Sequence, residues 1–209
     1  MGEPRIQAPE PVPGRPQPPI RLGTVADAAA AADLHAEGIA EGFLVVLGPR
    51  FLRRLYRRIV RSSGAALLVA EDEVGVTGFV AVAADTGRLY REFLVHDGVL
   101  AGAAAAPAIA RAPRHVWETL RYGTSDDAAL PRAEILSVAV ATRARGTGLG
   151  TRLVEAGIRQ LHALGQPEAQ VVTATDNAAA LRMYEKAGFV PVATTEVHRG
   201  SPQQVLVCR

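Results

Sequence analysis

Residues 133–153, with the sequence AEILSVAVATRARGTGLGTRL, constrain the fold of this chain more than any other stretch. An apolar run containing Ile135, Leu136, Val138 and Val140 has the composition of a buried strand. Three glycines then follow at alternate positions, and beyond them apolar residues recur at helical spacing. The stretch therefore predicts a strand, a glycine loop and a helix in succession.

Such a junction between a strand and a helix suits an anion. The first turn of a helix leaves backbone N–H groups unpaired and carries the positive end of the helix dipole. Glycines allow the backbone to approach a ligand closely, so a phosphate or pyrophosphate is the natural guest. Arg145, Thr151 and Arg152 flank the loop with groups that neutralise or hydrogen-bond phosphate oxygens. The alternative is an ordinary glycine-rich turn into a helix.

Two familiar phosphate loops do not fit the glycine pattern. A P-loop requires GxxxxGK followed by Ser or Thr, and no lysine follows these glycines. A dinucleotide-binding fingerprint requires GxGxxG, whereas the spacing here is GxGxG, with no acidic residue closing a following strand at the expected interval. We therefore expect a guest that is neither ATP nor NAD.

Composition restricts the class of protein. The 209 residues suffice for one domain with a sizeable core, and 48% of them are hydrophobic, which indicates a globular chain. The net charge of +2 is too small to argue for a nucleic-acid partner. The single cysteine, Cys208, excludes an internal disulfide framework and a cysteine-based metal cluster, so we expect no metal site and a reducing cytoplasm.

The sequence contains no recognisable targeting signal and no predicted membrane-spanning segment. Residues 1–18 are rich in proline and are expected to form a disordered extension, without the apolar core of a signal peptide. The alanine-rich run near Ala101 is too short for a membrane span and is interrupted at Pro107. We therefore expect a domain over residues 19–209 that resides in the cytoplasm and does not contact a membrane.

Strand and helix signals alternate along this domain. A short strand at 20–22 and an alanine-rich helix after Thr24 are followed by a loop at 41–48 and an amphipathic helix from Pro49. The further expected elements are strands at 65–71 and 76–83, broken helical pieces within 89–122 interrupted at Gly98, Pro107 and Pro113, a polar loop at 123–131, a strand at 170–175, a helix ending at Gly188, and strands at 189–197 and 203–208. Hairpins at both ends favour one mixed sheet in an α/β or α+β fold.

Two features of these elements have both a purely structural and a functional interpretation. The helix from Pro49 carries six arginines on one face, which is typical of a solvated basic surface, with an anion or nucleic-acid patch as the alternative. Trp117 is expected to be a core anchor rather than a substrate platform. His35, alone on its helix, receives no role.

Three motifs in a fixed order resemble the GNAT superfamily of acetyl-CoA-dependent N-acetyltransferases. They are RxxGxG at Arg145, Gly148 and Gly150, a strand leading to Asn177, and the helix DNAAALRMYEKAGF with Tyr184 and Gly188. The resemblance covers residues 19–209 and is strongest from 133 onward. It implies a single-domain GNAT fold, in which a mixed, mostly antiparallel sheet is flanked by helices and a splayed strand pair holds acetyl-CoA.

The resemblance also implies which residues contact this cosubstrate. The backbone of three strand residues should pair with the pantetheine arm as an added strand would: Val138, Ala139 and Val140. The loop and first helical turn should cradle the pyrophosphate beside Arg145: Gly146, Thr147, Gly148, Leu149, Gly150 and Thr151. Asn177 should bond the cofactor arm.

Acetyl transfer to an amine requires a base, donors for the carbonyl oxygen, and an acid for the thiolate. The resemblance places the Tyr184 hydroxyl near the thioester sulfur as the acid and a strand N–H near Val138 as the oxyanion donor. Glu134 matches the glutamate base of histone-type members, although a glutamate opening a strand could equally face solvent. Some protein N-terminal acetyltransferases carry a base on the later strand, where this chain has Val171 and Val172.

The position of Cys208, one residue from the end of the chain, disfavours an acetyl-enzyme and favours direct transfer in a ternary complex. The expected acceptor is a primary amine of a small molecule or a protein, met by the segments 41–47 and 196–201, where Glu41, Glu196 and His198 could contact a cation. The insertion 89–130 could line this cleft or mediate homodimer formation. A non-catalytic acyl-CoA-binding regulatory module is the alternative function.

Overall fold

The computed structural model describes residues 17–39, 43–111, 130–198 and 201–209. One seven-stranded sheet runs through the molecule in the order β1-β2-β3-β4-β5-β7-β6. The strands are β1 Ile20–Leu22, β2 Ala65–Asp72, β3 Gly75–Ala83, β4 Glu134–Val140, β5 Ala169–Ala174, β6 Val190–His198 and β7 Ser201–Cys208. Every neighbouring pair is antiparallel except β4 and β5, so the predicted mixed, mostly antiparallel sheet is confirmed.

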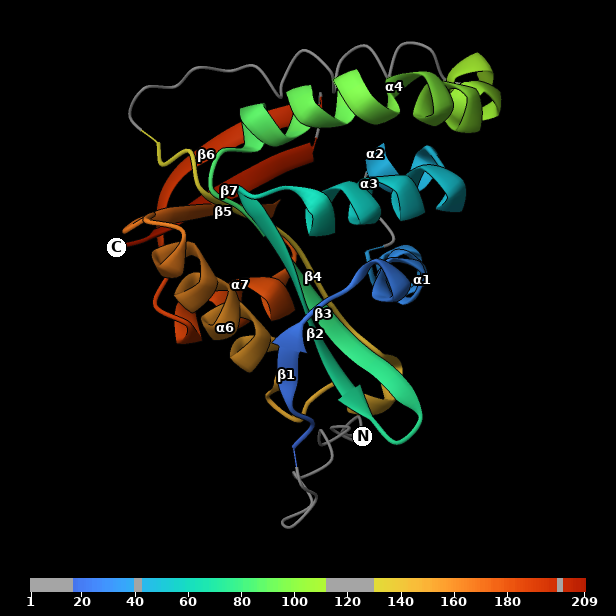
Figure 1. Ribbon diagram of the computed structural model, residues 1–209. Helices are drawn as coiled ribbons and strands as arrows, with labels where there is room; N and C mark the ends of the chain where they lie inside the picture. The colour runs from blue at the N-terminus through green and yellow to red at the C-terminus, as the bar shows by residue number, and fades with distance from the viewer. Residues whose placement is uncertain (1–16, 40–42, 112–129, 199–200) are drawn as a thin grey trace, which may run out of the picture.

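Helices cover both faces of the sheet (Figure 1). They are η1 Val25–Asp27, α1 Ala28–Gly38, α2 Phe43–Val46, α3 Pro49–Arg61, α4 Thr86–Arg111, η2 Thr142–Ala144, α6 Leu149–Ala163 and α7 Ala178–Lys186. The apolar sides of α1, α3 and α4 form one core against the sheet, and those of α6 and α7 form the second core on the opposite face. The flanked sheet agrees with the expected fold class.

Two predicted irregular segments are helical in the structure. The predicted breaks at Gly98 and Pro107 are wrong, because α4 continues through both positions. Packing against α3 stabilises its first half, where Arg58 bonds Asp97 at 2.7 Å and Phe51 meets Phe93 edge to face at 5.3 Å between ring centroids. The predicted loop at 41–48 contains the one-turn helix α2.

Several predictions fall on parts of the chain that lie outside the described residues. This group comprises residues 1–16 of the extension predicted at 1–18, the break at Pro113, the position of Trp117 and nearly all of the polar loop at 123–131. Self-association through the insertion at 89–130 stays a prediction. The exposed apolar side chains of Leu94, Val95 and Val99 on α4 are compatible with it.

Neither a membrane span nor a metal cluster is found in the described part of the chain. None of its helices is both long and apolar enough to cross a bilayer. No three His, Cys, Asp or Glu side chains of these residues gather where they could hold a metal ion.

An ion pair between the partly exposed Arg21 and the buried Asp27 connects β1 to the start of the first helical segment. Asp27 is 8% exposed, receives two hydrogen bonds from the Arg21 guanidinium at 2.9 and 3.0 Å, and receives a third from the Thr24 backbone N–H at 2.7 Å. The Arg21 hydrogen bonds lower the pKa of Asp27 to about 2, against the burial that raises it. The ionised pair therefore stabilises the fold above about pH 4, and this contribution is lost as the pH falls toward 2.

We expect Asp27→Asn to lower the free energy of unfolding at pH 7 by about 1–2 kcal/mol. The low end of this range is favoured because Arg21 is partly exposed and solvent screens the pair. Urea unfolding at pH 7 and pH 3 measures the effect, and the difference between variant and wild type should shrink at pH 3. An unchanged difference would rule out the pair as its source.

Candidate active site

The sheet opens between its two parallel strands. β4 and β5 share one register pair, Glu134 opposite Gln170, supported by a 2.8 Å hydrogen bond from the Gln170 N–H to the Ala133 carbonyl. Both strands lie wholly within the described residues and no further pair joins them there, whereas all of β5 pairs with β7 on its other side. Figure 1 shows β5, β7 and β6 turning away from β2–β4. This split matches the expected splayed strand pair.

A β-bulge sets which backbone groups of β4 face the split. Ile135 pairs with Val82 and Ser137 pairs with Ala81, so Leu136 is the extra residue. Beyond the bulge the Ala141 N–H donates to the Thr77 carbonyl of β3 at 2.9 Å. Because these directions alternate along a strand, the N–H and C=O groups of Val138 and Val140 face the split.

The same alternation turns the backbone of Ala139 toward β3, where it lies opposite Phe79. Of the three residues expected to pair with a pantetheine arm, the structure therefore offers the edges of Val138 and Val140. The Arg145 side chain already reaches this edge, with its Nε donating to the Val140 carbonyl at 3.3 Å.

The predicted glycine loop leads into α6 and is open. Gly146 and Gly148 have φ of +79° and +82°, and a Cβ built on either would meet no atom within 4 Å. Gly148 is the N-cap, and the first N–H of the segment that finds a backbone partner among the described residues is that of Arg152, bonded to the Gly148 carbonyl at 3.2 Å. The N–H groups of residues 146–151 donate no hydrogen bond within that same part of the chain.

The other residues of this segment have further structural roles. The Thr147 hydroxyl donates to the Ala144 carbonyl at 2.8 Å, which closes the loop. Leu149 is buried in the core beneath the helix, and Thr151 is half-buried. Gly150 lies inside the first turn, where a Cβ would come within 2.7 Å of the Met183 sulfur on α7. Its small size thus allows α6 and α7 to approach each other.

Asn177 is the N-cap of α7. Its side-chain oxygen accepts a hydrogen bond from the Ala180 N–H at 3.1 Å, as such residues commonly do at this position. The side chain is exposed, and its amide N–H groups have no partner among the described residues, so they are available to a ligand.

Tyr184 and Glu134 lie on opposite faces of the sheet. Tyr184 is 5% exposed on α7, with its ring 5.8 Å from that of Phe189. Glu134 opens β4 and accepts a 2.9 Å hydrogen bond from the Thr86 hydroxyl of α4, on the other face. Burial raises the pKa of the Glu134 carboxyl, and burial together with the Glu134 charge raises the pKa of Tyr184. A carboxyl with a raised pKa suits a base near neutral pH.

The structure also brings together polar residues that sequence reasoning missed. His35 Nδ1 lies 2.6 Å from the Tyr56 hydroxyl, which lies 2.9 Å from the Ser137 hydroxyl, and all three side chains are buried. Tyr90 of α4 is a further phenol whose pKa is raised by burial and by the Glu134 charge. These residues lie far apart in the sequence, and no local motif marks them.

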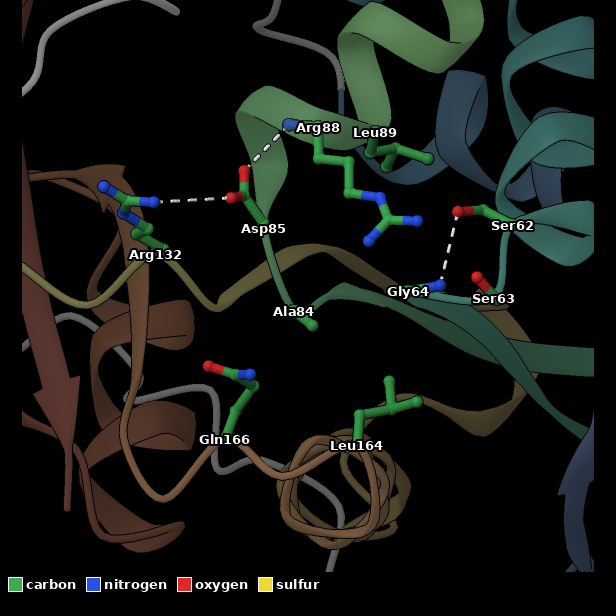
Figure 2. Close-up of a pocket in the computed structure, with 10 residues that line it drawn as sticks. All are labelled: Ser62, Ser63, Gly64, Ala84, Asp85, Arg88, Leu89, Arg132, Leu164 and Gln166. Atoms are coloured by element: carbon green, nitrogen blue, oxygen red, sulfur yellow. Dashed lines mark hydrogen bonds and ion pairs between the residues drawn. The ribbon is translucent and has the colours of Figure 1, made fainter.

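A cavity of about 440 Å³ lies at the other end of β4 from the glycine loop (Figure 2). It is lined by residues that follow α3, residues at the start of α4 and residues just after α6. The Asp85 carboxylate in this cavity accepts a hydrogen bond from the Arg88 backbone N–H at 2.8 Å and lies 3.9 Å from the Arg132 guanidinium. None of the predicted site residues lines this cavity. It is therefore separate from the split.

A sheet split between two parallel strands, with a glycine loop and the start of a helix beside the split, is the arrangement of an acetyltransferase fold. Two comparisons with known proteins support this assignment. Residues 40–189 match the model of the Acetyltransferase (GNAT) family, and the chain belongs to this family. Its fold is similar to that of yncA from Salmonella typhimurium, whose structure holds its cofactor acetyl-CoA, with a TM-score of 0.60, 18% identity and coverage of 93% of this chain and 94% of that one. A ribosomal-protein-alanine N-acetyltransferase from Brucella melitensis gives a TM-score of 0.57, 19% identity and coverage of 90% and 97%.

Curated relatives match shorter segments. A mycothiol acetyltransferase from Streptomyces scabiei is 40% identical over 78 residues, which are 37% of this chain and 25% of the relative. One from a Parafrankia strain is 41% identical over 59 residues, or 28% and 18% of the two chains. The matches thus span a quarter or less of these relatives.

Proposed function

We propose that this protein transfers the acetyl group of acetyl-CoA directly to a primary amine in a ternary complex. The observation that carries the proposal is the split between β4 and β5, with Glu134 on one face of the sheet and Tyr184 on the other. Such a passage allows two substrates to meet from opposite sides. Membership of the GNAT family supports acetyl-CoA as one of them.

The residues around the split fit this cosubstrate. The N–H groups of residues 146–151, which donate no hydrogen bond to any described residue, and the positive end of α6 suit the diphosphate, with Arg145 beside them. The split-facing edges of Val138 and Val140 can pair with the amide groups of the pantetheine arm once the Arg145 side chain releases the Val140 carbonyl, and the Asn177 amide can donate to the arm. Acetyl-CoA supplies the activated acyl group.

The same residues account for the chemistry. Ionised Glu134 takes a proton from the acceptor amine, directly or through water, so that the nitrogen can attack. The Val138 N–H, which faces the split, donates to the carbonyl oxygen as its charge develops. Because its pKa is raised, Tyr184 stays protonated at physiological pH and donates a hydrogen bond to the leaving thiolate.

We favour a small-molecule amine as the acceptor over a protein amino group, because the curated relatives are mycothiol acetyltransferases. We also place the reaction in the cytoplasm, which the single cysteine favours. A panel of amines with acetyl-CoA, read by release of free thiol, tests the proposal. Tight acetyl-CoA binding without thiol release from any amine would instead favour a non-catalytic binding module.

We expect Tyr184→Phe to lower kcat by about 10–100-fold, since it removes one hydrogen bond to the leaving group and keeps the ring packed on Phe189. The dissociation constant for acetyl-CoA, measured by calorimetry, should stay within error of wild type. Equal turnover in the variant would remove Tyr184 from the chemistry.

A further inference from the structure

A continuous hydrogen-bonded chain of three buried side chains ends at the bulge of β4. His35 comes from α1, Tyr56 from α3 and Ser137 from β4, and their polar atoms lie 2.6 and 2.9 Å apart. The three residues are 3%, 1% and 9% exposed. The chain therefore runs from a covering helix, through a second helix, to the edge of the split.

Packing alone does not account for the hydroxyl groups of this chain. The Tyr56 ring meets Phe79 edge to face at 5.1 Å between centroids, a contact that a phenylalanine would make equally well. Burying a hydroxyl or an imidazole without a partner costs free energy, so each polar group here needs the others. Apolar side chains of similar volume would fill the same space without this requirement. The polar chain thus calls for a reason beyond the core.

Ser137 lies where the acceptor amine of the proposed reaction must arrive. Ser137 and Glu134 flank the bulge at Leu136 and face the side of the sheet covered by α1, α3 and α4, as their contacts with Tyr56 and Thr86 show. The split begins just beyond the Glu134 pair with Gln170. An amine between the two side chains would face the thioester through the split.

The hydrogen bonds from His35 through Tyr56 also orient the Ser137 hydroxyl. Burial lowers the pKa of His35 to about 4, so its ring is neutral at physiological pH and has one nitrogen that accepts a proton. With Nδ1 as this acceptor, the Tyr56 hydroxyl donates to His35 and the Ser137 hydroxyl donates to Tyr56. The remaining lone pairs of Ser137 Oγ then accept from an N–H of an incoming amine.

We propose that Ser137 is a direct contact of the acceptor amine, and that Tyr56 and His35 are positioning residues that hold its hydroxyl so that the nitrogen lone pair aims at the acetyl carbonyl. This inference rests on the proposed function. In this proposal the hydrogen-bonded side chains of His35, Tyr56 and Ser137 align the acceptor. They are separate from the Glu134 base and from the acetyl-CoA site. No bond is made or broken in Ser137; it accepts one hydrogen bond.

The test compares Ser137→Ala, Tyr56→Phe and the double variant with wild type in steady-state acetyl transfer. Each single change is expected to lower kcat/KM for the amine by about 10-fold or more, with the KM for acetyl-CoA unchanged. Because the two residues act as one unit, the double variant should be no worse than the worse single variant. Ser137→Thr, which keeps the hydroxyl, should restore most of the activity.

Thr77→Val is the matched control for loss of a buried hydroxyl. Thr77 is fully buried on the adjacent strand β3, and its hydroxyl has no partner among the described residues. Wild-type kcat/KM is expected in this variant. Full activity in Ser137→Ala and Tyr56→Phe, or changes confined to the melting temperature, would overturn the inference while leaving the proposed function intact. Absence of acetyl transfer by the wild-type protein would instead reject the proposed function, and with it this alignment role.

Discussion

Glu134→Gln is expected to lower kcat for acetyl transfer by about 10²–10⁴-fold, the range that a positioned general base contributes. The amide keeps the size of the side chain and can still accept the Thr86 hydrogen bond, so the loss isolates basicity. Since the carboxyl must be ionised to act, wild-type activity should fall as the pH drops through its raised pKa. The variant should lack this acidic limb in a plot of kcat against pH.

A stability measurement accompanies this activity loss. Burial raises the pKa of Glu134 above its unfolded value, so the ionised carboxyl opposes folding at higher pH. Glu134→Gln is therefore expected to unfold at a higher temperature than wild type at pH 8, with the gap closing in acid. Glu168→Gln, an exposed carboxylate paired with Arg209, is the control and should change neither property. A Glu134→Gln variant with near wild-type turnover would show that the base lies elsewhere.

Gly148→Val is expected to weaken acetyl-CoA binding by about 10²–10³-fold. The residue has φ of +82°, where a β-branched side chain is strained, so the backbone must rotate and move the N–H groups of the loop. Loss of about two charge-assisted hydrogen bonds to the diphosphate accounts for the magnitude. Calorimetry with acetyl-CoA measures the change.

Gly165→Val is the matched control at the other end of α6. Its φ is +79° and, as at Gly148, no atom lies within 4 Å of a built Cβ. Both variants should therefore lose similar stability from the same backbone strain, but Gly165→Val should bind acetyl-CoA as wild type does. Equal weakening in both variants would mean that the effect comes from the fold rather than from a phosphate site.

The elements that sequence reasoning predicted are those with local signals. The apolar run, the alternating glycines and the helical spacing within residues 133–153 specify β4, the loop and α6 with little help from distant residues. Asn177 and Gly188, which flank α7, act through local capping geometry in the same way. These short-range motifs also carried the family resemblance.

The remaining features depend on contacts between distant residues. The break at Gly98 was predicted from local propensity, but the pairing of Arg58 with Asp97 across two helices supports a continuous α4. The bulge at Leu136 is visible only once β4 is paired with β3. Glu134 accepts a hydrogen bond from Thr86, which lies 48 positions earlier in the sequence, so no local motif indicates this environment.

A crystal structure of the protein with acetyl-CoA would show whether the split between β4 and β5 binds this cosubstrate. We expect the diphosphate within hydrogen-bonding distance of the N–H groups of residues 146–151. The pantetheine arm should pair with Val138 and Val140, and the thioester should lie beside the Tyr184 hydroxyl. A cosubstrate bound elsewhere, with the split filled by side chains, would contradict the account.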